Sequence, residues 1–108
     1  MKLAVVYDSN NGRVCRHFEN AKVIKLYETE DREIVHTEMV GTMAESTEDI
    51  LGLILMLDAD CVLCDEISAD SMELLNSEGI LFYSGMEHDA DEAVEAFING
   101  YVMFGPDD

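Results

Sequence analysis

The order of strand-like and helix-like patterns along the chain is the feature that most restricts its fold. Five runs have the apolar or alternating character of β-strands, at residues 2–7, 22–27, 33–40, 60–64 and 80–83. Helical patterns with a serine cap or an apolar stripe occupy residues 46–57, 68–79 and 90–98. The last two strand runs each follow a helix, and this alternation predicts parallel strands that are covered by helices.

The polar segment Glu30-Asp31-Arg32 separates two alternating runs and therefore predicts a β-hairpin. Together, these patterns predict an α/β fold with a mixed five-stranded sheet and helices on both of its faces. A length of 108 residues suits one domain over residues 1–108, in which residues 101–108 form a tail.

The helix expected at residues 46–57 has apolar side chains around nearly all of its circumference. A helix that only covers a sheet needs a single apolar stripe, so more than one side of this helix should be covered. The apolar residues 101–104 of the tail are one candidate cover, and a second copy of the chain is the other. We therefore expect a monomer or a homodimer, and slightly favour coverage by the tail.

The charge of the chain is strongly negative, because 24 acidic residues stand against six basic ones and leave a net charge of −18. All of the basic residues lie within the first 32 positions. A field of this sign repels polyphosphates and anionic lipid surfaces, so we expect neither nucleic acid nor membrane as a partner. Two explanations remain open, namely solubility and docking on a basic protein partner.

The N-terminal apolar run ends at Asp8 and is too short for the core of a signal peptide. Later apolar runs are far too short to span a bilayer. We therefore expect a cytoplasmic protein, in which thiols stay reduced. The three cysteines cannot all pair within one chain, so they are interpreted as free thiols or as metal ligands.

Chemistry-bearing residues follow three of the predicted strands, at the sheet edge where α/β proteins bind ligands. They are Cys15, Arg16 and His17 in the first loop, Cys64 in the second, and Met86 and His88 in the third. Thiols and imidazoles are ligands of zinc, copper and iron–sulfur species. The expected cofactor-binding residues are Cys15, Arg16, His17, Cys64 and His88, with Cys15, His17 and Cys64 as metal ligands.

Simpler interpretations exist for several of these residues. Cys61 and Cys64 form a CxxC pair, but residues three apart on a strand face opposite sides and cannot chelate one ion. His88 is equally well placed to start the last helix. Cys15 lies between Arg13 and Arg16, whose charge should favour its thiolate. Alkylation should therefore modify Cys15 first, Cys64 next and Cys61 only after unfolding.

Enzymatic functions have weaker support. Asp8 and Asp65 follow two predicted strands, where a metal-dependent nuclease would place carboxylates for two ions. Acids at strand ends are usually turn formers, and the net charge of −18 would repel a polyphosphate substrate. A nuclease-like enzyme is therefore only a remote alternative.

Four segments of the chain can be compared with known families. They are RHFENA (16–21), LYETEDREIV (26–35), ADCVLCDEISADSMELLNSEGILFY (59–83) and DEAVEAFINGY (91–101). In this order they resemble the dinitrogenase iron-molybdenum cofactor biosynthesis family, over roughly residues 1 to 101. The resemblance implies a ribonuclease H-like fold and noncovalent carriage of a metal–sulfur cluster. It also implies that His17 of the His-Phe pair is a candidate ligand.

One residue and one short segment differ from the family pattern. Glu19 stands where the family usually has glycine, and Cys64 to Ser68 replaces a glycine-rich turn. Glycines let backbone N–H groups approach an anionic cluster, whereas carboxylates repel it. We expect these changes to weaken cluster binding or to alter its specificity, while Arg13 and Arg16 supply a local positive charge.

The leading functional prediction is a carrier, without catalytic turnover, of a metal–sulfur cluster, the iron-molybdenum cofactor or a precursor of it. Its partner would be a cofactor-acceptor protein or another basic protein. The alternative is a cofactor-free interaction module whose acidic surface docks on a basic partner.

Overall fold

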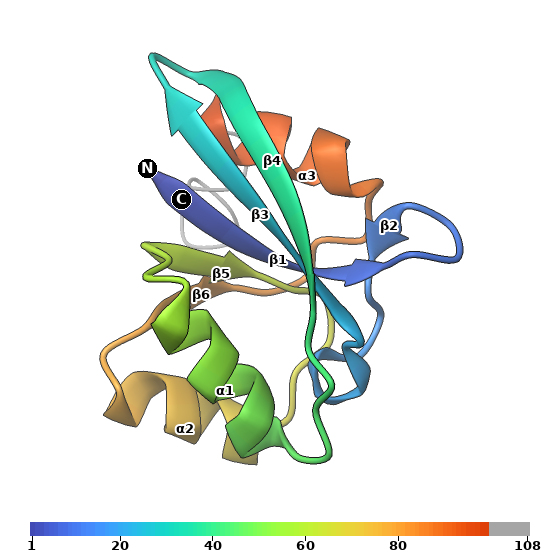
Figure 1. Cartoon of the computed structure of the whole chain (residues 1–108), viewed down its shortest axis with the longest axis vertical. Coiled ribbons are helices and arrows are strands. Elements are labelled where there is room, and N and C mark those ends of the chain that lie inside the picture. The colour runs from blue at the N-terminus through green and yellow to red at the C-terminus, as the bar shows by residue number, and fades with distance from the viewer. Residues whose placement is uncertain (100–108) are drawn as a thin grey trace.

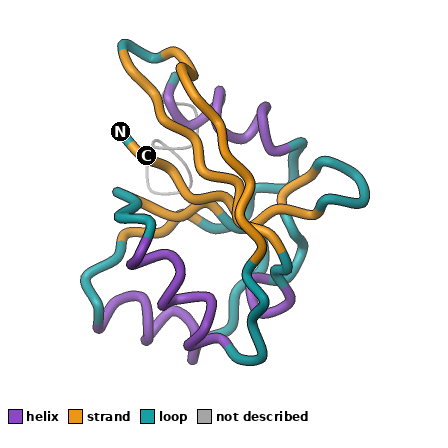
Figure 2. The backbone as a smooth tube through the Cα atoms, in the orientation of Figure 1, coloured by secondary structure: helices purple, strands orange, loops and turns teal. Residues whose placement is uncertain are grey.

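The structure is a computed structural model and describes residues 1–99. Its strands are β1 (Lys2–Asp8), β2 (Arg13–Val14), β3 (Val23–Glu30), β4 (Glu33–Gly41), β5 (Cys61–Leu63) and β6 (Leu81–Tyr83). Its helices are the short 3₁₀ helix η1 (Phe18–Asn20), α1 (Thr47–Met56), α2 (Ala69–Ser77) and α3 (Ala90–Ile98). Figures 1 and 2 show a twisted sheet that runs between these helices. The elements follow the predicted order.

The sheet is mixed, with strand order β4-β3-β1-β5-β6. β1 lies in its centre, antiparallel to β3 and parallel to β5. The prediction of five strands was one short, because β2 also pairs with β1. This strand has only two residues and no periodicity that a sequence could reveal. It is brought back onto β1 by a turn in which the Gly12 N–H bonds to the Asp8 carbonyl at 2.9 Å, with a Gly12 φ of 74°.

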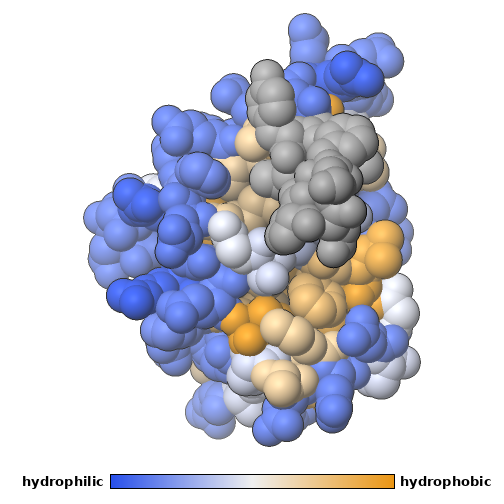
Figure 3. All heavy atoms as spheres, turned by 180° about the vertical axis from the view of Figure 1, so that it is seen from behind, coloured by the Kyte–Doolittle hydropathy of each residue, from blue (hydrophilic) through white to orange (hydrophobic). Residues whose placement is uncertain are grey.

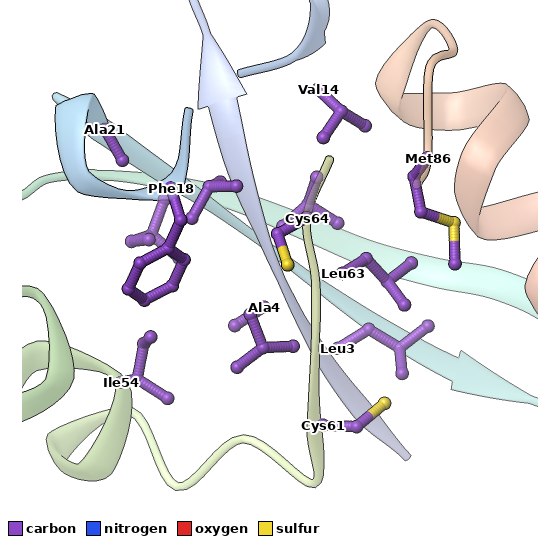
Figure 4. Packing of buried hydrophobic residues seen from close by; sticks show 14 of the residues in the cluster. Leu3, Ala4, Val14, Phe18, Ala21, Ile54, Cys61, Leu63, Cys64 and Met86 are labelled. Carbon is purple, nitrogen blue, oxygen red and sulfur yellow. The ribbon is translucent and has the colours of Figure 1, made fainter. Parts of the chain in front are cut away.

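Helices cover both faces of the sheet, as predicted. α1 and α2 lie on one face, and α3 lies on the other (Figure 1). The two buried cysteines of the CxxC pair show the alternation directly (Figure 4). Cys64 lies on the side of Ala4, Phe18 and Ile54, whereas Cys61 lies on the side of Leu3, Leu63 and Met86. The two thiols therefore lie on opposite faces of the sheet, as the alternation of a strand predicts.

The predicted helix ends are formed by the expected side chains. Oγ of Ser46 accepts a hydrogen bond from the Asp49 N–H at 3.3 Å, and Oγ of Ser68 accepts one from the Ser71 N–H at 3.1 Å. Each bond satisfies one of the backbone donors that a helix leaves free at its start. After α2, Gly79 has a φ of 72° and adopts the left-handed conformation that the sequence predicted.

The hairpin between β3 and β4 turns at Asp31 and Arg32, whose φ angles are 53° and 67°. Two central residues with positive φ define the tight turn whose twist matches that of paired strands. Glycine, asparagine and aspartate tolerate these angles, so Asp31 suits the turn and Arg32 is its strained residue. The pairing of β3 and β4 shifts register between Glu28 and Thr29.

On the face seen from behind, apolar side chains gather in the lower half among hydrophilic ones (Figure 3). Leu55 and Met56 at the end of α1 are 46% and 80% exposed. The predicted cover for this helix, residues 101–104, lies outside the described residues. Within residues 1–99 no helix is long and apolar enough to cross a membrane.

Candidate functional site

Three loops meet at the carboxyl edge of the parallel strands. The Glu66 N–H donates to the Arg16 carbonyl at 2.9 Å, which ties the loop after β5 to the loop after β1. The Val14 N–H donates to the His88 carbonyl at 2.9 Å, which ties in the loop before α3. Backbone hydrogen bonds therefore tie the three loops together, and the side chains of Arg13 and Arg16 add further contacts between them.

The first of these loops forms a cavity of about 290 Å³, which we call the Cys15 cavity. It is lined by Tyr7, Asp8, Ser9, Asn10, Cys15, Arg16, His17, Asn20 and Lys22. Three of the five predicted cofactor-binding residues therefore share one cavity. Sequence reasoning missed the amides of Asn10 and Asn20 and the ammonium of Lys22, because turn-forming residues and a strand-flanking lysine carry no motif.

The charge in this cavity is unusual for the protein. Arg16 and Lys22 oppose the single carboxylate of Asp8, while the whole chain carries a net charge of −18. Hydroxyl and amide groups supply further hydrogen-bond donors. The lining of the Cys15 cavity thus carries more positive than negative side chains, and Glu66, which pairs with Arg16, lies outside this lining.

Cys15 is half-buried, and its Sγ donates a hydrogen bond to the His17 carbonyl at 3.3 Å. Burial raises the pKa of the Cys15 thiol, and the charge of Asp8 raises it further, against the lowering effect of a hydrogen bond to the His17 backbone. The expectation that Arg13 and Arg16 favour the thiolate was therefore wrong. Both arginines have other partners, since Arg13 donates to the Glu87 carbonyl and Arg16 pairs with Glu66.

Arg16 and Glu66 form an exposed ion pair, with Nε 2.9 Å from Oε2. The Arg16 hydrogen bond lowers the pKa of Glu66. Nδ1 of His17 lies 3.8 Å from the same oxygen, and half of the His17 side chain is exposed. Arg13 donates to the Glu87 carbonyl at 3.2 Å. Glu66 thus neutralises part of the predicted positive charge but leaves the His17 ring open to a ligand.

Cys64 does not reach the cavity. Its side chain is fully buried, and its Sγ donates to the Tyr83 carbonyl at 3.6 Å. Burial, reinforced by the charges of Glu19 and Asp65, raises the pKa of Cys64 to about 12. Cys64, which directly follows β5, still continues the alternation of that strand, and its side chain points into the core. Within residues 1–99 no three His, Cys, Asp or Glu side chains could hold a metal ion, so the predicted Cys15, His17 and Cys64 metal site is not formed.

The third loop contributes its backbone rather than ligands. His88 is exposed, and it lies outside the lining of the Cys15 cavity. Met86 is 2% exposed and belongs to the core on the α3 side of the sheet (Figure 4). Neither side chain joins Cys15 and His17. The predicted role of His88 in starting α3 fits its place directly before the N-cap residue Asp89.

Glu19 does not point at the cavity, contrary to the expected repulsion. Its Oε2 accepts hydrogen bonds from the Ser71 hydroxyl at 2.5 Å and from the Ser68 N–H at 3.0 Å. Burial acts to raise its pKa, but these hydrogen bonds outweigh burial and the pKa of Glu19 is lowered. Glu19 therefore caps the N-terminus of α2, where a carboxylate is favoured.

A neighbouring cavity of about 500 Å³ collects the carboxylates of the loops. Asp8, Asp65 and Glu87 line it together with Arg13 and Arg16. Burial, followed by the charges of Glu87 and Glu66, raises the pKa of Asp65. The two acids of the nuclease alternative thus share a cavity, but its lining is net negative and would disfavour a polyphosphate.

A larger cavity of about 600 Å³ lies at the opposite edge of the sheet. Its lining includes Cys61, Leu81, Tyr83 and Phe97. Burial raises the pKa of Cys61 to about 12. One buried thiol among apolar and aromatic side chains suits packing rather than ligation.

Comparison with known proteins places these loops in context. A family model described as dinitrogenase iron-molybdenum cofactor matches residues 1–100. No curated protein sequence matches the chain. The crystal structure of PH0822 superposes with a TM-score of 0.84 at 24% identity, over 93% of this chain and 92% of that chain.

Two further solved structures are similar. The Methanocaldococcus jannaschii protein MJ0327 gives a TM-score of 0.75 at 23% identity, over 93% of this chain and 89% of that chain. The apo form of the orange protein from Desulfovibrio gigas gives a TM-score of 0.80 at 16% identity, over 94% and 89%. At these identities the superpositions show a shared fold.

Proposed function

The chain belongs to the dinitrogenase iron-molybdenum cofactor family, and from this premise we propose that it carries a metal–sulfur cluster or an iron-molybdenum cofactor precursor without catalytic turnover. The cargo binds in the Cys15 cavity and leaves for a cofactor-acceptor protein. We also propose that the fold is ribonuclease H-like, in support of which the sheet has three antiparallel strands beside two parallel crossovers.

The observation that carries the proposal is the composition of the Cys15 cavity. It combines a thiol and an imidazole, which are ligands of iron, copper and molybdenum–sulfur species, with the cations Arg16 and Lys22. Metal–sulfur clusters are anionic, and the remainder of the acidic surface would repel them. Among residues 1–99, this cavity therefore offers the chemistry that such a cargo needs.

The donor set fits a noncovalently held cargo better than a resident cluster. Iron–sulfur clusters that are permanent parts of a protein usually have four cysteine ligands, and Cys61 and Cys64 are buried away from Cys15. Cys15 and His17 supply two ligands at most, while hydrogen-bond donors and cations bind the remaining anionic atoms of the cargo. A small number of protein ligands also favours the release of the cargo to an acceptor protein.

The test is anaerobic reconstitution with iron and sulfide, and separately with molybdate, copper and sulfide. The readouts are the absorption spectrum and the metal content after gel filtration. The variants Cys15→Ser and His17→Ala should retain at least about tenfold less cargo, because even the loss of a partner that orients a metal ligand costs about tenfold or more in affinity. The matched control is His88→Ala, which removes an exposed imidazole outside the cavity and should retain as much cargo as the parent chain.

Two outcomes contradict the proposal. One is a parent chain that retains no cluster under any of these conditions. The other is equal retention by Cys15→Ser, His17→Ala and His88→Ala, which would move the site elsewhere.

The second candidate is a cofactor-free module that docks on a basic partner, which the net charge of −18 favours. It predicts metal-free protein after anaerobic purification, and binding to an immobilised basic partner that fails at high salt, because surface charges are screened within a Debye length of about 3 Å at 1 M salt. A retained cluster together with salt-insensitive loading rejects this alternative.

A further inference from the structure

The outer edge of β4 has no strand partner among residues 1–99. β4 is nine residues long, whereas β6 at the other edge of the sheet has three. Proteins commonly protect such edges by making them short or by covering them, since a free edge pairs with other strands. Every residue from Val35 to Met39 is exposed, so nothing in this part of the chain covers the middle of β4.

We propose that this edge pairs with the β4 edge of a second copy, antiparallel and with Thr37 on the two-fold axis. This inference is independent of the proposed cargo. In this register Val35 lies opposite Met39 of the second copy, and His36 lies opposite Glu38. Val35 and Met39 are 54% and 61% exposed, although both are apolar. The pairing therefore joins two apolar residues and places an imidazole opposite a carboxylate, each pair occurring twice.

The alternative registers do not match in this way. A shift of the axis to His36 places Met39 opposite Glu33, and a shift to Glu38 places two carboxylates opposite each other. β4 is also regular from His36 to Gly41, and its register shift relative to β3 lies at Val35. The proposed axis at Thr37 thus lies within the regular part of the strand, and the Val35–Met39 pairs lie at the margin of that part.

The charge of the chain sets the conditions under which pairing occurs. Two copies with a net charge of −18 each repel one another. Salt from about 0.01 M to about 1 M shortens the Debye length from about 30 Å to about 3 Å and screens this repulsion. Association should therefore strengthen with NaCl, which is the opposite of what docking on a basic partner would show.

The first experiment is sedimentation equilibrium of the full chain at increasing NaCl, with a mass rising from 12.1 kDa toward twice that value. His36→Glu should weaken the association about tenfold, because it creates two like-charged pairs. The double variant H36E/E38H restores an imidazole opposite a carboxylate and should restore dimerisation. The matched control H88E changes the net charge equally, outside β4, and should dimerise like the parent.

The second experiment tests the register by disulfide cross-linking. Thr37→Cys places two thiols opposite each other and should form a covalent dimer on mild oxidation. His36→Cys faces Glu38 and should cross-link much more slowly, as should the parent chain. A monomer at every salt concentration, equal weakening by H36E and H88E, or equal cross-linking at positions 36 and 37 would each overturn the proposal.

Discussion

The hydroxyl of Tyr27 donates a hydrogen bond of 2.6 Å to Oδ1 of Asp91, which joins the middle of β3 to the first turn of α3. Nζ of Lys25 lies 3.2 Å from the same oxygen and 5.0 Å from the centre of the Tyr27 ring. Tyr27 is fully buried. A polar network at the solvent-exposed rim therefore adds to the apolar packing of α3 on the sheet.

Asp91→Ala should lower the free energy of unfolding by about 2 kcal/mol, because it leaves the buried Tyr27 hydroxyl without an acceptor. Urea denaturation measures this change. Glu92→Ala, in the same helical turn and likewise exposed but not bonded to Tyr27, should cost about 0.5 kcal/mol or less. Equal losses in the two variants would show that the hydrogen bond contributes no stability.

The same network predicts a dependence on acid. The Tyr27 hydrogen bond lowers the pKa of Asp91, burial opposes this, and Lys25 lowers it further. A carboxyl with a lowered folded-state pKa adds stability above its usual value of 3.8, and this contribution is lost as the pH falls through the folded-state value. Between about pH 4 and about pH 2, the parent chain should therefore lose more stability than Asp91→Ala. Urea midpoints across this range test the difference.

Glu19→Gln should destabilise the fold by about 1 to 2 kcal/mol, because a neutral amide accepts weaker hydrogen bonds from Ser68 and Ser71. Glu73→Gln, on the exposed side of α2, is the matched control and should change the unfolding free energy little. Thermal unfolding of both variants at neutral pH compares them. If Glu19→Gln had the melting temperature of the parent chain, the contact of Glu19 with α2 would not be stabilising.

The three thiols should differ in their rates of alkylation because they differ in burial. Cys15 is half-buried, whereas Cys61 and Cys64 are 2% and 0% exposed. Alkylation of the native protein should modify Cys15 alone, and the other two should react together once denaturant unfolds the chain. Mass spectrometry of timed samples distinguishes this from the order predicted by sequence, in which Cys64 reacts before Cys61.

The turn at Asp31 and Arg32 offers a stabilising change. Arg32 has a φ of 67°, and glycine adopts this conformation without steric cost, so Arg32→Gly should stabilise the hairpin by about 0.5 to 1 kcal/mol. Glycine also has more freedom in the unfolded chain, and this sets the upper limit of the gain. Thermal unfolding of Arg32→Gly beside the parent chain measures it, and a lower melting temperature would contradict the strain.

Much of the fold could be predicted because each element carries its own local signal. The serine caps, the left-handed Gly79 and the apolar stripe of α3 each depend on a few neighbouring residues. The two-residue strand β2 could not be predicted, because its pairing depends on a turn rather than on a pattern.

The site was predicted less completely because side-chain direction is set by the tertiary structure. The sequence indicated which loops would meet, and Cys15 and His17 do share a cavity. It did not indicate that Cys64 turns inward, that Arg16 pairs with Glu66, or that Glu19 caps α2. Each of these depends on a partner that is distant in sequence.

The central position of β1 has a consequence for the order of folding. β1 precedes every other strand in the chain, and the bond between its Lys2 N–H and Asp60 spans 58 residues. The β3–β4 hairpin closes only a short loop and should form first, whereas the β1–β5 pair must wait for a long segment to close. We therefore expect the docking of β5 and β6 to limit the folding rate. An early intermediate that contains only the antiparallel strands β1, β3 and β4 should be the species that most readily pairs with the wrong strands.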